Sequence, residues 1–259
     1  MKESYKIPSK FLRKVTVKVI GAGGTGSAMI AGLAQMCVAL QSLDGAEMDV
    51  VVYDDDIVTS SNVGRQAFAN CDVGLPKSRV LVNRVNQTFG LRWKAIAEKF
   101  TSEDDESHSN CIYIGCVDTR KARKEILLAF KQRNYSTRWW LDCGNGARSG
   151  QVVLGAIDRK KSDLPSVADL FPEVVDTTLD GKDDQPSCSL PQALQKQDLF
   201  TNRMVADTAL NLLWQLFRYG ETDYHGVFIN LQTMRTNPLA IDPVAWERMG
   251  YTRNINDGN

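Results

Sequence analysis

Short apolar runs alternate along this chain with longer segments in which apolar residues recur at helical spacing. Val15–Ile20 and Met48–Tyr53 are rich in β-branched residues, and the three consecutive valines of the second run show no polar alternation, as in a parallel strand buried on both faces. Between them, Thr25–Leu43 has the spacing of a helix that packs along one side. These segments predict a strand, a turn, a helix and a strand, in that order.

The alternation continues beyond this first unit. Further strands are expected at 93–100, 111–117, 138–143 and 151–157, and further helices at 74–89 and 122–133. Strands and helices that alternate in this way predict an α/β fold with a Rossmann-like, doubly wound and mostly parallel sheet.

A polar, acidic and proline-bearing stretch, 158–189, interrupts the pattern and predicts a long crossing loop; irregular segments of that length are commonly functional. A long helix over Leu190–Tyr219 and a closing hairpin or extended pair over 224–237 follow. We expect one domain over 1–259, divided into an N-terminal arm (1–14), a strand-and-helix core (15–157), the crossing loop (158–189) and a C-terminal helix with strands (190–259).

Composition narrows the classes of function. The 31 basic and 31 acidic residues cancel, which gives no sequence-wide electrostatic case for binding nucleic acid or an anionic membrane. No segment resembles a signal-peptide core or approaches the roughly 18 apolar residues of a membrane span, so we expect a cytoplasmic protein. The cysteines form no CxxC pair, which argues against zinc and against a disulfide framework. They are Cys37, Cys71, Cys111, Cys116, Cys143 and Cys188.

A glycine-rich turn separates the first predicted strand from its helix. Its glycines are Gly21, Gly23, Gly24 and Gly26. Such a turn lets backbone N–H groups approach a phosphate at the positive end of a helix. Asp54, at the end of the second strand, has the position of an acidic side chain that binds ribose hydroxyls, and a helix or loop cap is the alternative. Hydride-transfer enzymes and adenylating enzymes both use a glycine turn of this kind.

An amide and two cations follow the tip of the second strand. Asn62, Arg65 and Lys77 together suit a triphosphate, which a hydride-transfer enzyme does not need to hold. Each cation on its own could be an ordinary solvated surface charge. The glycine turn and this cluster together favour ATP over a nicotinamide cofactor.

These motifs resemble one family in their order and density. Gly-x-Gly-Gly-x-Gly at 21–26, Asp-x-Asp-x-Val-x-x-Ser-Asn-x-x-Arg-Gln at 54–66 and Gly-Leu-Pro-Lys at 74–77 are similar to the ThiF, MoeB and ubiquitin-activating adenylyltransferase superfamily. The likeness covers roughly residues 15 to 155. Through its compact length and its Pro-Ser-Cys-Ser segment at 186–189, the chain is most similar to the ThiF-like proteins of bacterial PRTRC systems.

The resemblance implies a role for each matching residue. Nucleotide-binding residues would be Gly21, Gly23, Gly24, Gly26, Asp54, Asp56, Asn62, Arg65 and Lys77. Asp54 would hold the ribose with Asp56 as a supporting residue, and the amide and the cations would contact the triphosphate. Asp118 would bind Mg²⁺ at the end of its strand; a helix N-cap is the other interpretation of this residue.

The chemistry of adenylation agrees with these roles. The attacking carboxylate is already ionised at neutral pH, so no general base is required. The barrier is charge build-up on phosphate, which Mg²⁺ at Asp118 together with Arg65 and Lys77 would neutralise.

Two later segments carry further candidates. Cys188 lies just before a predicted helix, where a lowered thiol pKa would favour thioester formation of the kind seen in ubiquitin-activating enzymes; an ordinary structural cysteine is the alternative. Asn145 and Arg148, in a glycine-rich turn, could line a channel for a peptide tail, although a simple hairpin explains the glycines equally well.

The resemblance also implies a homodimer. Relatives place an N-terminal arginine into the partner's site, and the basic residues available here are Lys6, Lys10 and Arg13. The predicted function is ATP- and Mg²⁺-dependent adenylation of the C-terminal carboxylate of a small ubiquitin-like protein, with a possible thioester on Cys188. Activation of a small molecule or a tRNA base, an NAD-binding oxidoreductase and a non-catalytic nucleotide sensor remain as alternatives.

Overall fold

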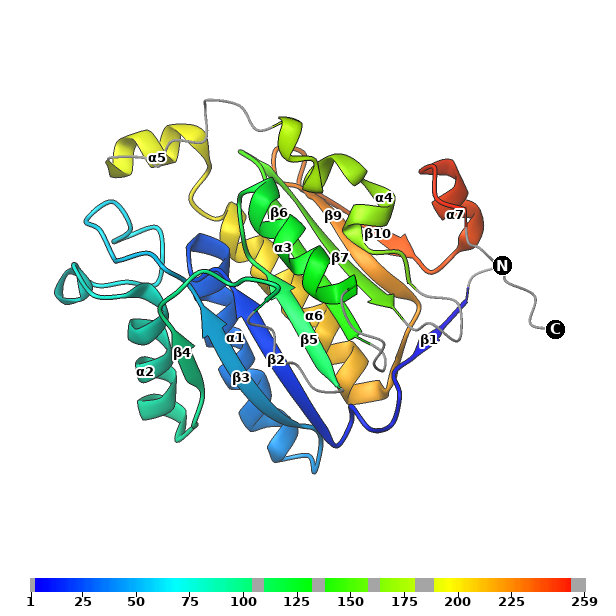
Figure 1. The fold of residues 1–259 in the computed structure, drawn as a ribbon, viewed down its shortest axis with the longest axis horizontal. Coiled ribbons are helices and arrows are strands. Elements are labelled where there is room, and N and C mark those ends of the chain that lie inside the picture. The colour runs from blue at the N-terminus through cyan, green and yellow to red at the C-terminus, as the bar shows by residue number, and fades with distance from the viewer. Residues whose placement is uncertain (1–2, 104–109, 132–137, 158–163, 180–188, 253–259) are drawn as a thin grey trace.

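An eight-stranded sheet lies at the centre of the molecule (Figure 1). The computed structural model describes residues 3–103, 110–131, 138–157, 164–179 and 189–252. The strand order is β10-β9-β7-β6-β5-β2-β3-β4. The strands are β2 (Lys14–Ile20), β3 (Glu47–Tyr53), β4 (Lys94–Ile96), β5 (Cys111–Gly115), β6 (Arg138–Asn145), β7 (Ser149–Ile157), β9 (Tyr224–Asn230) and β10 (Arg235–Ala240).

The sheet has a parallel part and an antiparallel part. Strands β4, β3, β2, β5 and β6 are parallel to one another, whereas β7, β9 and β10 are added in antiparallel pairs. Every residue of β5 is buried, as expected for a parallel strand covered on both faces. The chain leaves β2 towards β3 on one side and later returns to β5 on the other. Ligands of open α/β sheets bind at the carboxyl ends of the strands where the order reverses in this way.

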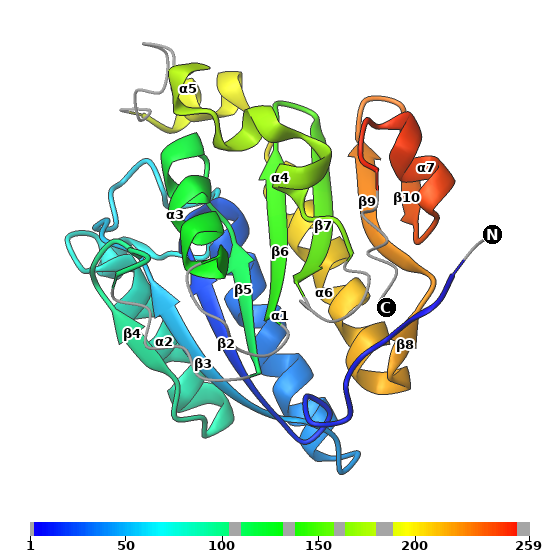
Figure 2. The same cartoon turned by 45° about the vertical axis from the view of Figure 1, so that its right-hand side comes forward.

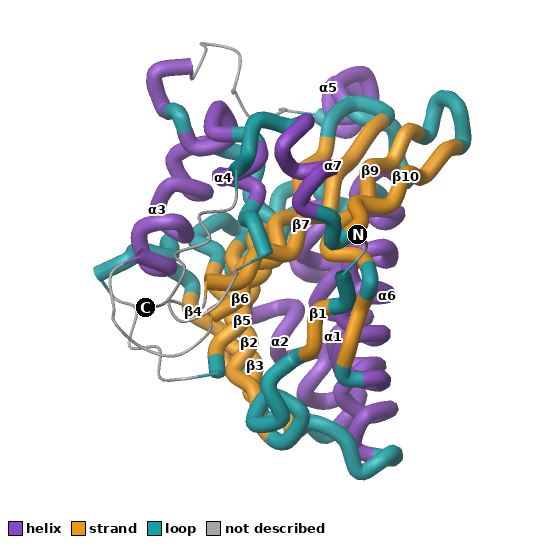
Figure 3. The backbone as a smooth tube through the Cα atoms, turned by 90° about the vertical axis from the view of Figure 1, so that its right-hand side faces the viewer, coloured by secondary structure: helices purple, strands orange, loops and turns teal. Residues whose placement is uncertain are grey.

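Helices cover both faces of the sheet (Figures 2 and 3). One face carries α1 (Gly24–Gln41), α2 (Lys77–Phe89) and α6 (Thr201–Tyr219), and the other carries α3 (Arg120–Lys131) and α4 (Val167–Leu170). Helices α1 and α6 pack so closely that a Cβ on Gly32 would collide with the side chain of Leu210. This arrangement confirms the predicted doubly wound α/β fold.

The predicted single helix over Leu190–Tyr219 is wrong. The structure has two helices, α5 (Leu190–Lys196) and α6, with an extended Gln197 between them. The backbone N–H of Asp198 donates to the carbonyl of Ala147 at 3.0 Å, and the Asp198 carboxylate pairs with Arg148 at 2.9 Å. The helix is interrupted because the backbone N–H and the carboxylate of Asp198 bond to the β6–β7 turn instead.

Several boundaries also differ from the sequence-based expectation. Helix α2 begins at Lys77 rather than at Gly74, because Pro76 is its N-cap, and the strand expected at 93–100 shortens to β4. The described part of the expected crossing loop, 164–179, holds α4 and 3-10 turns at Pro172–Val175 and Thr177–Leu179. The sequence patterns did not predict β1 (Tyr5–Lys6), its partner β8 (Glu221–Thr222), the 3-10 turn Asn70–Asp72 or α7 (Pro243–Arg248). None of the described helices is long and apolar enough to cross a membrane.

A buried histidine joins α7 to the sheet. His225 of β9 is fully buried; its Nε2 accepts from Trp246 Nε1 at 2.9 Å, and its Nδ1 lies 3.0 Å from the carbonyl of Leu154. Because Nε2 accepts, Nδ1 carries the proton and donates to that carbonyl. Burial lowers the pKa of His225 to about 4, so the ring is neutral in the folded protein.

This histidine predicts an acid-sensitive contribution to stability. The unfolded chain takes up a proton near pH 6.5, whereas the folded ring does so only near pH 4, so the free energy of unfolding falls by up to about 3 kcal/mol as pH drops through that window. Urea unfolding at several pH values, in the native protein and in His225→Gln, measures this. The variant should lose that part of the pH dependence; identical slopes in the two proteins would contradict the assignment.

Candidate active site

The glycine turn joins β2 to α1 through contacts that leave no room for a side chain at three of its four glycines. Gly21 has a φ of +96°, and a Cβ there would lie 2.5 Å from the carbonyl oxygen of Cys116. A Cβ on Gly26 would collide with the carbonyl of Gly21, and one on Gly24 with the side chain of Asn202. The N-cap, Gly23, offers no side chain to the first N–H groups of α1, which suits the approach of an anion.

Asp54 fastens this turn to the tip of β3. Its Oδ2 accepts from the backbone N–H of Ala22 at 2.6 Å and its Oδ1 from the N–H of Asp56 at 2.9 Å. Burial raises the pKa of Asp54, and these two N–H groups and the charge of Lys77 oppose that shift. The cap anticipated as an alternative is therefore present, and ribose binding by the same carboxylate stays a prediction.

Lys77 is the first residue of α2, and its ammonium is buried beside a carboxylate that is largely exposed. Its side chain is 8% exposed, and its Nζ lies 2.7 Å from Oδ2 of Asp56, whose side chain is 65% exposed. The backbone N–H of Lys77 also donates to the carbonyl of Asp56. A solvated surface charge, the bland interpretation of this lysine, is excluded. The ammonium is fixed at the edge of the sheet, and the carboxylate of Asp56 that pairs with it is largely in contact with solvent.

Asn62 and Arg65 lie on the loop that follows β3. Asn62 is buried, and its Oδ1 accepts from the N–H and the hydroxyl of Thr59, which leaves its Nδ2 as the group able to donate elsewhere. Arg65 is half-buried and donates through Nε to the carbonyl of Ser61 at 3.0 Å. Burial lowers its pKa, and within the described ranges no carboxylate pairs with it. Its remaining N–H groups suit a phosphate.

An ion pair missed by sequence reasoning holds this loop. Arg84 of α2 donates to the carboxylate of Asp72 at 2.7 Å and to the carbonyl of Ala67 at 2.5 Å. Although burial acts to raise it, the pKa of Asp72 is lowered overall by the N–H of Ala69 and by Arg84. Ser27 Oγ of α1 accepts from the N–H of Ala67 at 3.2 Å. The loop is thus fixed to both α1 and α2, and no motif marked these residues in advance.

Asp118 lies in the loop after β5, at the same edge as the glycine turn. The backbone N–H of Cys116 donates to the carbonyl of Ile20 at 2.8 Å, which brings the ends of β5 and β2 together. Helix α3 begins at Arg120, and Thr119 Oγ1 accepts from the N–H of Ala122. Thr119 therefore takes the position of the cap, and Asp118 is left with an exposed carboxylate at the point where the strand order reverses.

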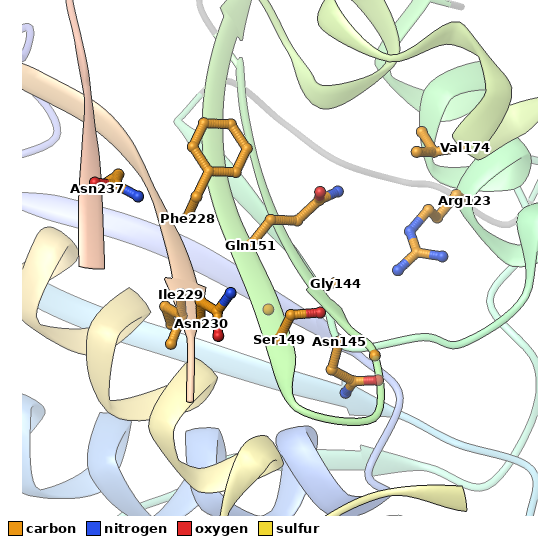
Figure 4. Close-up of a pocket in the computed structure, with 12 residues that line it drawn as sticks. Arg123, Gly144, Asn145, Ser149, Gln151, Val174, Phe228, Ile229, Asn230 and Asn237 are labelled. Atoms are coloured by element: carbon orange, nitrogen blue, oxygen red, sulfur yellow. The ribbon is translucent and has the colours of Figure 1, made fainter. Parts of the chain in front are cut away.

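A pocket of about 550 Å³ opens beside this edge, over the carboxyl end of β6 and the neighbouring antiparallel strands (Figure 4). It is lined by Arg123, Gly144, Asn145, Gly146, Ser149, Gly150, Gln151, Val174, Phe228, Ile229, Asn230 and Asn237. Asn145 connects it to α1, because its Nδ2 donates to Thr25 Oγ1 at 2.8 Å and to Asn202 Oδ1 at 2.7 Å. Arg148, proposed from the sequence as a second lining residue, instead pairs with Asp198.

Arg123 and Asp142 form a buried ion pair that the sequence analysis did not identify. The Nε of Arg123 lies 2.9 Å from Oδ1 of Asp142, whose side chain is fully buried. Burial raises the pKa of Asp142, and the charge and hydrogen bond of Arg123 oppose the shift. The pair connects α3 to β6, and Arg123 contributes to the wall of the pocket.

Other candidates lie outside this group. Cys188 falls outside the described residues. A hydrogen bond that the Cys143 thiol donates to the sulfur of Cys116, together with burial, raises the pKa of Cys143 well above its usual value, so this thiol is poorly suited to nucleophilic attack. Arg13 directly precedes β2, at the end of the strand opposite Gly21. Among the described residues, no cluster of three or more His, Cys, Asp or Glu side chains could hold a metal ion.

Comparison with known proteins identifies the family of this chain. The model described as "ThiF family" matches residues 8–243. The chain belongs to the ThiF family. No curated protein sequence matches it. The narrower likeness to the PRTRC proteins stays a prediction, since the matching model describes the ThiF family as a whole.

Solved structures share the fold of this chain. E. coli MccB with ATP has a TM-score of 0.62 and 15% identity, and the match covers 90% of this chain and 65% of MccB. PaaA has a TM-score of 0.58 and 16% identity, over 88% of this chain and 64% of PaaA. E. coli MccB with AMPCPP and MccA has a TM-score of 0.61 and 16% identity, over 89% and 65%. This chain therefore spans less than two thirds of the length of these proteins.

The ion pair between Arg84 and Asp72 predicts local rigidity of the loop that carries Asn62 and Arg65. In Arg84→Met, amide hydrogen exchange across 59–73 should accelerate about tenfold, the equivalent of about 1.4 kcal/mol of local opening energy. The matched control is Arg92→Met, which changes an exposed arginine beyond the end of α2. Equal exchange rates across the loop in both variants would show that the pair does not hold it.

Proposed function

We propose that this protein uses ATP and Mg²⁺ to adenylate the C-terminal carboxylate of a small ubiquitin-like protein. The observation that carries the proposal is the continuity of two sites. A glycine turn with fixed cations lies at the edge where the strand order reverses, and Asn145 links that turn directly to an open pocket. An adenylating enzyme needs this combination, because the acceptor carboxylate must reach the α-phosphate.

The residues at the edge fit a nucleotide triphosphate with its metal. The first N–H groups of α1 and the cations Arg65 and Lys77 would bind phosphate oxygens, and Asp54 would hold the ribose with Asp56 as a supporting residue. Mg²⁺ is commonly bound by one or two carboxylates together with substrate phosphates, which the exposed Asp118 satisfies without a preformed cluster. When bound, Mg²⁺ would supply neutralisation of charge on the phosphates.

The protein's own residues would then act by position and charge. The acceptor carboxylate forms a bond to the α-phosphorus as the bond to pyrophosphate breaks, and no proton has to be removed. Lys77 and Arg65 would stabilise the charge that develops on the phosphates and on the departing pyrophosphate. Asn145, fixed by Thr25 and Asn202, would keep the pocket and the glycine turn in register.

The neighbours supply the analogy for the acceptor. MccB has been determined with ATP and, separately, with AMPCPP and MccA. We further propose a single adenylation domain over residues 1–259 that acts as a homodimer, in which Lys6, Lys10 or Arg13 would serve the partner's site. Thioester formation on Cys188 would be a separate step after adenylation.

Lys77 provides a direct test of the nucleotide site. Lys77→Ala should lower ATP–pyrophosphate exchange by about 10²-fold or more, because one fixed cation at the phosphates is lost. Exchange would be measured with Mg²⁺ and a small ubiquitin-like protein as the candidate acceptor. Lys99→Ala is the matched control: Lys99 also pairs with an aspartate of the β3 tip, Asp55 at 3.5 Å, but its side chain is 78% exposed. Equal activity in the two variants would refute the role of Lys77.

Asp118 tests the metal site separately. Asp118→Asn keeps the size of the side chain and removes its charge, so exchange should fall by about 10²-fold or more at low Mg²⁺ concentration. Nucleotide binding measured without Mg²⁺ should remain unchanged, since the phosphate-binding residues are intact. Full exchange activity in this variant would show that exchange does not require the charge of Asp118.

A further inference from the structure

Helices α1 and α6 meet at their N-terminal ends through a buried amide. The two helices pack against each other on one face of the sheet (Figure 3). Asn202, in the first turn of α6, is 8% exposed, and its amide lies against Gly24, the first residue of α1. A Cβ on Gly24 would collide with Nδ2 and Cγ of that amide. A polar side chain from the C-terminal part of the chain therefore lies directly behind the glycine turn.

Hydrogen bonds fix the orientation of this amide on both sides. Asn202 Oδ1 accepts from the hydroxyl of Thr25 at 3.0 Å and from Asn145 Nδ2 at 2.7 Å, and its Nδ2 donates to Gln197 Oε1 at 2.6 Å. Gln197 Nε2 in turn donates to the carbonyl of Gly146 at 3.0 Å. Because a carbonyl oxygen can only accept, this last bond sets the direction of the Gln197 amide and, through it, that of the Asn202 amide.

The network ends on Thr25, the second residue of α1. Its buried hydroxyl donates to Asn202 and accepts from Asn145 Nδ2 at 2.8 Å, so both of its hydrogen-bonding roles are used inside the protein. The first N–H groups of a helix have no partner within the helix, and the N-cap Gly23 supplies none from a side chain. A phosphate at this turn would therefore meet backbone N–H groups, whose direction depends on how the first turn of α1 is held.

We propose that Asn202 is a positioning residue of the nucleotide site: its amide holds Gly24 and Thr25 so that the first N–H groups of α1 point at the phosphates of the nucleotide. This assignment rests on the proposed function for the identity of the ligand, and it adds a residue that lies 177 positions after Thr25. Asn202 acts through the turn and is not itself a contact of the nucleotide.

Asn202→Asp tests the direction of the network with little change in shape. The new oxygen would oppose Gln197 Oε1, and the Gln197 amide could reverse only by turning its own oxygen towards the carbonyl of Gly146. The Kd for ATP, measured by isothermal titration calorimetry with Mg²⁺ and without an acceptor, should rise by about tenfold or more. The matched control is Asn211→Asp, the same change at an exposed position of α6, which should bind ATP like the native protein.

Thr25 supplies a second, uncharged test that preserves the packing. Thr25→Val keeps the shape of the side chain and removes the hydroxyl, so the Kd for ATP should rise by about fivefold or more. Thr25→Ser keeps the hydroxyl and should restore binding to within about twofold of the native protein. Native ATP affinity in both Asn202→Asp and Thr25→Val would overturn the proposal, as would equal losses in Thr25→Val and Thr25→Ser.

Exchange kinetics distinguish positioning from a loss of folded protein. In ATP–pyrophosphate exchange, the apparent KM for ATP should rise in Asn202→Asp in step with the Kd. A residue that only stabilised the fold would instead lower the maximal rate, because less active enzyme would be present, and would leave KM unchanged. A lowered maximal rate at native KM would therefore reject the positioning role.

The proposed function and this assignment fail in different ways. Weakened ATP binding in Asn202→Asp and Thr25→Val, together with no exchange by the native protein, would reject adenylation and keep the role of Asn202. Exchange by the native protein, together with native ATP affinity in both variants, would support adenylation and reject that role. An absence of ATP binding by the native protein would reject both.

Discussion

The close approach of the glycine turn to the end of β5 is the constraint on which the candidate site depends. Gly21 lies against the carbonyl of Cys116, and a Cβ on Gly26 would collide with the carbonyl of Gly21. Only this approach lets the N–H of Ala22 reach the carboxylate of Asp54 and brings the strand that precedes Asp118 to the start of α1. A side chain at either glycine would separate the ends of β2, β3 and β5 and disperse their functional groups.

The parallel and antiparallel parts of the sheet carry different kinds of side chain. The parallel strands end in loops that gather charged groups, whereas the antiparallel strands present an uncharged, partly open face. Asn145 lies where these parts meet, and its hydrogen bonds to Thr25 and Asn202 tie both to the helices beneath. The same junction interrupts the C-terminal helix, because Asp198 bonds to the β6–β7 turn. The break between α5 and α6 therefore arises at the β6–β7 turn, next to the residue that links the pocket to the glycine turn.

The sequence predicted those features that depend on local pattern. The buried strands, the glycine turn and the order of Asp54, Asn62, Arg65, Lys77 and Asp118 could all be read from spacing and from the family resemblance. It did not predict the break at Gln197 or the pairs Arg84–Asp72 and Arg123–Asp142, because these depend on contacts between residues that are distant along the chain. Helical periodicity alone continues through 190–219, and the helix is interrupted where Gln197, Asp198 and Thr201 bond to the β6–β7 turn.

The buried and half-buried cations differ in whether a buried carboxylate pairs with them. This difference distinguishes a cation that stabilises the fold from one that is available to bind an anion. Arg123 is matched by a fully buried carboxylate, so its charge is already compensated. Lys77 pairs with Asp56, whose carboxylate remains largely in water, so an anion could share the ammonium without leaving a buried acid unpaired. Arg65 is partly desolvated, and a backbone carbonyl is its described acceptor. Among the described residues, the cation without a carboxylate partner therefore lies at Arg65, on the loop after β3, and this asymmetry would direct a phosphate to that edge rather than into the neighbouring pocket.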